Sequence, residues 1–111
     1  MSDANTFERI SCAVARTLVD AGTCAIVDIR DEQSFLQAHI PEATLLDNQS
    51  IGDFIAASDK NVALLVYCYH GNASQQASQY LAEQGFQRVL SVDGGFEQWR
   101  ADFPELVIGS S

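Results

Sequence analysis

The chain has 111 residues, 47% of them hydrophobic and 19% charged, which is the size and composition of one folded domain, residues 1–111. Its 15 acidic and 6 basic residues give a net charge of −9, so we expect neither nucleic acid nor an anionic membrane as a partner. No apolar run approaches the roughly 18 residues that span a membrane, and the start MSDANTFERI lacks the basic and apolar pattern of a signal peptide, which predicts a cytoplasmic protein.

Helix-like and strand-like segments alternate along the first half of the chain. Ser11 is expected to cap a helix that ends near Gly22. The β-branched apolar run CAIVDIR, residues 24–30, predicts a buried strand. Asp31 is expected to cap a short helix over residues 32–39.

The second half continues the alternation. After a turn and a short strand over 40–46, Ser50 is expected to cap a helix over 50–59. The run NVALLVY, residues 61–67, is apolar on both faces and should therefore be a central strand. The remaining elements are a helix over 73–84 that Gly85 stops, a strand over 88–92, and a glycine turn followed by a final helix. This alternation predicts an α/β fold with a mostly parallel sheet.

The three cysteines and two histidines form no metal site or disulfide framework by their spacing. Cys12, Cys24 and Cys68 contain no C-x-x-C pair. His39 and His70 are too few and too scattered to complete a metal site. We expect Cys12 and Cys24 to be buried and inert, as free cysteines usually are.

Cys68 lies in a different setting, at the junction between the central strand and the next helix. Ligands of parallel sheets bind beyond the carboxyl ends of the strands, and Tyr67 ends this one. The loop that follows can direct backbone N–H groups toward the sulfur as a nest, and Gly71 permits the positive φ that such a loop requires. A nest of this kind, with the adjacent helix N-terminus, favours the thiolate and makes Cys68 a nucleophile.

The same N–H groups can hold an anion in a protein whose surface is acidic. Residues 69–79 contain no lysine or arginine, so only His70 could add positive charge there. Attraction of an anionic substrate would therefore depend on the backbone of the loop.

Three segments in order resemble a known family. AIVDIRDEQSFLQAHIPEA, VYCYHGNAS and SVDGGFEQW are similar to segments of single-domain rhodaneses, and most closely of the GlpE-type thiosulfate sulfurtransferases. The resemblance covers about residues 7–104 and implies a rhodanese-like fold, with a five-stranded, mostly parallel sheet and helices on both faces. Two family glycines are replaced here, by Ala38 and Glu42, so the resemblance does not determine the backbone conformation of the turn that contains them.

The resemblance also implies a reaction. Cys68 would take the outer sulfur of thiosulfate as a persulfide and pass it to cyanide or a small thiol, with thioredoxin as a further candidate acceptor and with no cofactor. The substrate would be bound and the sulfur charge stabilised by backbone N–H groups of the loop residues Tyr69, His70, Gly71, Asn72, Ala73 and Ser74.

Several side chains have a structural interpretation beside a functional one. Asp28 and Arg30 end their strand near Cys68, and we favour an ion pair that braces the loop over anion binding by Arg30. His70 either assists electrostatically or is simply exposed, and Tyr69 either shapes the pocket mouth or packs. Asn72 is expected to hold the loop through side-chain hydrogen bonds and Ser74 to cap the helix. His39 is expected to satisfy backbone groups at a turn, Gly94 and Gly95 to form a tight turn near the pocket, and Trp99 to lie in the core.

Two other functions remain as alternatives. Phosphatases of the rhodanese fold use C-x5-R, whose arginine binds phosphate, whereas residue 74 here is a serine. A non-catalytic rhodanese-like interaction module is the second alternative, although such modules often lack the cysteine.

Overall fold

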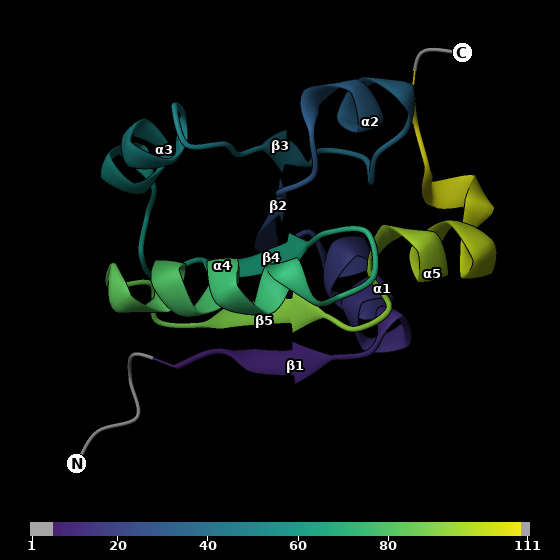
Figure 1. The fold of residues 1–111 in the computed structure, drawn as a ribbon. Coiled ribbons are helices and arrows are strands. Elements are labelled where there is room, and N and C mark those ends of the chain that lie inside the picture. The colour runs from purple at the N-terminus through teal and green to yellow at the C-terminus, as the bar shows by residue number, and fades with distance from the viewer. Residues whose placement is uncertain (1–5, 110–111) are drawn as a thin grey trace.

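The computed structural model describes residues 6–109, so part of the segment considered for a signal peptide lies outside the described residues. Its centre is a five-stranded sheet in which every neighbouring pair is parallel (Figure 1). The expected five-stranded parallel sheet is therefore confirmed. In spatial order the strands are β1 (Glu8–Ile10), β5 (Val89–Val92), β4 (Ala63–Tyr67), β2 (Cys24–Asp28) and β3 (Thr44–Leu45).

Helices cover both faces of the sheet, as expected. On one face α1 (Cys12–Ala21) and α5 (Gly95–Asp102) enclose a core that includes Trp99, which is fully buried. On the other face α3 (Ile51–Ala57) and α4 (Ala73–Glu83) enclose a second core around Phe86. The remaining elements are α2 (Glu32–Gln37), which follows β2, and a short 3₁₀ helix, Pro104–Leu106, which follows α5. Each face thus buries one side of the strands.

The central strand β4 delivers Cys68 to the carboxyl edge of the sheet. Leu64 and Val66 point into the core under α4, whereas Leu65 and Tyr67 point into the core under α5. All four are at most 1% exposed, which confirms the prediction of a central strand. By the same alternation, Cys68 points to the side of α4.

Ser11 and Asp31 cap their helices as predicted, whereas the prediction for Ser50 is wrong. Ser11 accepts a hydrogen bond from Val14 N, and Asp31 accepts one from Ser34 N. Ser50 has helical dihedrals and makes no side-chain capping bond. Its hydroxyl instead accepts from Asp47 N at 3.1 Å, and the Asp47 carboxylate accepts the N–H groups of Gln49 and Ser50. The turn before α3 is thus closed by the aspartate.

The turn with the two replaced glycines contains one residue in an unfavourable conformation. Glu42 has φ of 70°, in the left-handed region that glycine adopts without strain. Ala38 has φ of −167°, which any residue adopts. His39 satisfies backbone groups as expected, because its Nδ1 lies 2.8 Å from Phe35 O. Within residues 6–109, none of the helices is long and apolar enough to cross a membrane.

Candidate active site

The loop after β4 wraps around the sulfur of Cys68. The backbone N–H groups of Gly71 and Ser74 both donate to Cys68 Sγ at 3.2 Å. Gly71 has the positive φ, 92°, that the sequence predicted. The cysteine is only 4% exposed, so the sulfur receives these hydrogen bonds where little water competes for it. This arrangement is the nest expected from the sequence.

The loop shifts the pKa of Cys68 downward. Burial of the sulfur acts in the opposite direction, because it disfavours the charged thiolate. Hydrogen bonds from the Ser74 hydroxyl and from the backbone of Ser74, Gly71 and His70 outweigh it, so that the pKa of Cys68 is lowered. The thiolate is the nucleophilic form, and the loop therefore raises the share of reactive sulfur.

Ser74 does not cap the helix as predicted. It lies inside α4 and is fully buried beside the sulfur, with its hydroxyl 2.8 Å from the hydroxyl of Ser91 on β5. Asn72 likewise makes no side-chain capping bond to α4. The Gln75 side chain binds the loop, because its Nε2 donates to Gly71 O at 2.9 Å. The prediction for Ser74 failed because it treated the loop as an isolated turn.

The glycine turn before α5 supports the loop from the other side. Gly94 and Gly95 have φ of 82° and 61°. The first N–H groups of α5 donate to the active loop, which is the loop after β4 formed by residues 68–74. Phe96 N donates to Cys68 O at 2.8 Å, and Glu97 N donates to Tyr69 O at 3.1 Å. A Cβ atom on Gly95 would lie 2.5 Å from the carbonyl carbon of Tyr69. The prediction of a tight turn near the pocket is therefore confirmed, and glycine is required there for close approach.

Arg30 and Asp28 form the ion pair that we favoured. Arg30 Nη2 lies 2.7 Å from Asp28 Oδ2, with the two side chains 3% and 0% exposed. The same nitrogen donates to Ala38 O at 2.7 Å, and the guanidinium carbon lies 4.2 Å from the centre of the Phe96 ring. These contacts link the ends of β2, α2 and α5. The guanidinium is thus committed to partners within the fold.

Tyr69 links the active loop to α2. Its hydroxyl lies 2.6 Å from Ser34 Oγ and donates to the carboxylate of Asp31. The Tyr69 hydroxyl and the N–H of Ser34 hold the pKa of Asp31 down, at about 2. The sequence marks Asp31 only as a helix cap and gives no signal at Ser34. No local pattern reveals a contact between residues 31 and 69.

A small hollow opens above the sulfur. It has a volume of about 180 Å³ and is lined by Cys68, Tyr69, His70, Asn72 and Ala73. Tyr69, His70, Asn72 and Ala73 are exposed at its rim. All the loop residues predicted as a site, 68–74, are therefore brought together around one opening or directly beneath it.

Comparison with known proteins identifies the family. A scan against protein families matches the rhodanese-like domain over residues 11–102. The chain belongs to the rhodanese-like domain family. It is 52% identical to thiosulfate sulfurtransferase GlpE of Pseudomonas savastanoi pv. phaseolicola over an alignment of 102 residues. This alignment covers 92% of this chain and 95% of that protein.

Solved rhodanese-like domains have the same fold. The crystal structure of a rhodanese-like domain protein from Staphylococcus aureus matches with a TM-score of 0.72 and 26% identity, over 84% of this chain and 91% of that one. The solution structure of a rhodanese-like domain from Anabaena sp. matches with a TM-score of 0.80 over 92% of this chain and 79% of that one, at 22% identity.

The other two cysteines of this rhodanese-like domain are less suited to nucleophilic chemistry. Burial, together with the charges of Asp102 and Asp93, raises the pKa of Cys12 to about 11. Burial also raises the pKa of Cys24. Of the three thiols, only Cys68 has its pKa lowered, which agrees with the distinction drawn from the sequence.

Proposed function

We propose that this rhodanese-like domain is a thiosulfate sulfurtransferase that carries a sulfur atom as a persulfide on Cys68. The observation that carries the proposal is the pair of N–H groups, from Gly71 and Ser74, directed at Cys68 Sγ. The name of the relatives that are 52% identical over nearly the whole chain gives independent support.

The reaction we propose is a double displacement. The Cys68 thiolate attacks the outer sulfur of thiosulfate, the sulfur–sulfur bond of thiosulfate breaks, and sulfite leaves with the electron pair. Cyanide then attacks the outer sulfur of the persulfide and leaves as thiocyanate, which returns the thiolate. A thiolate acceptor would leave as a persulfide in the same way. Dividing the transfer into two displacements lowers the barrier of each.

The loop serves both charged states of the sulfur in this proposal. The N–H groups that stabilise the thiolate also stabilise the terminal sulfur anion of the persulfide and the incoming thiosulfate dianion. This local attraction is needed because the chain carries a net charge of −9. Asp28 and Arg30 act as a brace, while His70 and Tyr69 line the mouth. The reaction requires no metal and no organic cofactor.

A phosphatase function is less well supported. Phosphate-binding cysteine loops rely on a guanidinium that holds two phosphate oxygens. At the corresponding position of this chain, Ser74 bonds to Ser91, and the nearby Arg30 is held by Asp28 and Ala38.

A cytoplasmic location fits the proposal, because the reducing cytosol keeps catalytic thiols free, and all three cysteines are free thiols.

Intact-protein mass spectrometry after incubation with thiosulfate tests the proposal. The protein should gain one sulfur, about 32 Da, and lose it on addition of cyanide as thiocyanate appears. Cys68→Ser should abolish the gain, whereas the matched variant Cys24→Ser should retain it. Absence of sulfur loading in the unmodified protein would overturn the proposal. The next measurements would then be hydrolysis of p-nitrophenyl phosphate, for the phosphatase alternative, and a search for binding partners, for the interaction module.

A further inference from the structure

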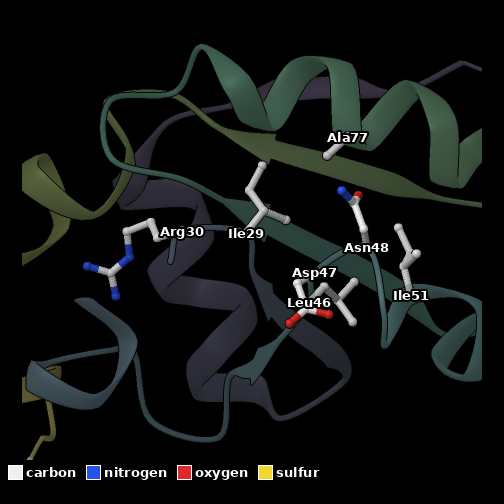
Figure 2. A pocket seen from close by; sticks show the side chains of 7 residues that line it. All are labelled: Ile29, Arg30, Leu46, Asp47, Asn48, Ile51 and Ala77. Carbon is white, nitrogen blue, oxygen red and sulfur yellow. The ribbon is translucent and has the colours of Figure 1, made fainter. Parts of the chain in front are cut away.

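A second cavity lies beside the active loop and has no part in the chemistry described so far. Its volume is about 310 Å³, and it opens between α3, α4 and the segments that follow β2 and β3. Figure 2 shows the side chains that line it, which are Ile29, Arg30, Leu46, Asp47, Asn48, Ile51 and Ala77.

The cavity lies beside the end of the strand that carries Cys68. In the register of β2 and β4, Asp28 lies opposite Tyr67, and Ile29 N donates to Tyr67 O at 3.1 Å. The next residues, Ile29 and Cys68, are therefore neighbours across adjacent chains, which lie about 4.8 Å apart in a sheet. Ile29 packs with the core under α4, the same side to which Cys68 points.

Helix α4 borders both the cavity and the hollow above the sulfur. Ala73 lines that hollow and Ala77 lines the cavity. The two alanines are four residues apart in one helix, so they lie on one face about 6 Å apart along the axis. A molecule whose reactive atom meets Cys68 can thus place its other end against Ala77.

The lining of the cavity specifies the kind of molecule that fits. Its walls are mostly apolar, from Ile29, Leu46, Ile51 and Ala77, and the Asn48 amide points toward α4 (Figure 2). The two charged groups are Asp47 and Arg30. Arg30 is paired with Asp28, and its side chain extends away from the other six (Figure 2). The Asp47 carboxylate accepts the N–H groups of Gln49 and Ser50 but has no ion-pair partner among the described residues, so its negative charge is the net charge at the cavity.

We propose that this cavity binds the body of the sulfur acceptor, a small thiol with an apolar chain and a neutral or positively charged far end. The proposal rests on the sulfur transfer proposed above and assigns its second substrate. The acceptor thiolate attacks the outer sulfur of the Cys68 persulfide, the bond between the two sulfurs breaks, and the Cys68 thiolate leaves. The acceptor, which gave its proton to water on ionising, departs as a persulfide. Cyanide is too small to need the cavity.

Filling the cavity should affect transfer to a thiol acceptor but not transfer to cyanide. Ala77→Leu projects an isobutyl group into it, and should raise KM for β-mercaptoethanol about tenfold, since burial of the two methylene groups of this acceptor is lost. Turnover with cyanide should stay unchanged. Gln76→Leu places the same side chain on the exposed face of α4 and should leave both acceptors unaffected. An unchanged KM for the thiol in Ala77→Leu, or an equal loss with cyanide, would overturn the proposal.

The charge preference can be measured on the unmodified protein, so the test does not depend on the folding of a variant. Cysteamine, β-mercaptoethanol and mercaptoacetate are of similar size and have positive, neutral and negative ends. At equal thiolate concentration, kcat/KM should fall in that order, and Asp47→Asn should narrow the ratio of the first to the last at least about threefold. Equal values for the three thiols, or a preference for mercaptoacetate, would refute the assignment. Sulfur loading and cyanide turnover, measured alongside, report separately on the proposed function.

Discussion

Replacing Ser74 by alanine tests how the loop activates the sulfur. In the native protein the Ser74 hydroxyl lowers the pKa of Cys68, and the substitution removes this hydroxyl. It keeps the backbone N–H of residue 74, which donates to Cys68 Sγ at 3.2 Å. A hydrogen bond to a charged acceptor contributes about 1.5 kcal/mol at the low end of the usual range. Since one pKa unit corresponds to about 1.4 kcal/mol, we expect the pKa of Cys68 to rise by about one unit.

The kinetic consequence has a definite sign on each side of the pKa. Below it, the thiolate fraction falls about tenfold, but a more basic thiolate is intrinsically more reactive by about threefold, so the net rate falls about threefold. Above the pKa, where the thiolate is fully formed in both proteins, the variant should react about threefold faster. Unfolding of the variant would instead expose the buried thiols to the reagent and raise the rate on both sides.

The assay is the pH dependence of the reaction with dithiodipyridine, followed by release of the coloured pyridinethione. Ser91→Ala serves as the matched variant, because it removes the partner of Ser74 and leaves the Ser74 hydroxyl beside the sulfur. The double variant Ser74→Ala/Ser91→Ala should keep the raised pKa while recovering stability, since no buried hydroxyl is left unpaired. An inflection in Ser74→Ala within a few tenths of a unit of the original would refute the reasoning and assign the activation to the N–H groups alone.

Three further predictions concern stability and titration. Glu42→Gly should raise the free energy of unfolding by about 0.5 kcal/mol in urea titrations, because glycine accepts the φ of 70° without strain, whereas Gln76→Gly inside α4 should lower it by about 0.8 kcal/mol. Ser78→Ala should raise the urea midpoint, because its buried hydroxyl has no hydrogen-bond partner among the described residues, and a lower midpoint would show that the hydroxyl is satisfied. Tyr69→Phe should move the pKa of Asp31 from about 2 toward the ordinary aspartate value of 3.8 in a carboxyl NMR titration. Because the folded pKa of Asp31 is depressed, its contribution to stability is present above the unfolded value and is lost as the pH falls through the folded one. The variant should lose most of that dependence, and an unmoved pKa would contradict the contact.

The sequence by itself determined the class of fold and the position of the nucleophile. The two-sided apolar run before Cys68 could only be a buried central strand, and the glycine loop after it could only turn into a helix. Those are local properties of consecutive residues. The same is true of Gly71, whose positive φ follows from the need to curl the loop around a sulfur three residues earlier.

Only the tertiary structure decided which distant residues complete the site. The three residues of β1 carry little strand signal of their own and form a strand because they pair with β5. Ser74 meets Ser91 because the segment after β4 lies against the neighbouring strand β5. Tyr69 meets Asp31 because the segments after the neighbouring strands β4 and β2 lie side by side. A hydroxyl bonds equally well to water, a helix N-terminus or another hydroxyl, so its partner is chosen by the packing that brings two segments together and excludes water.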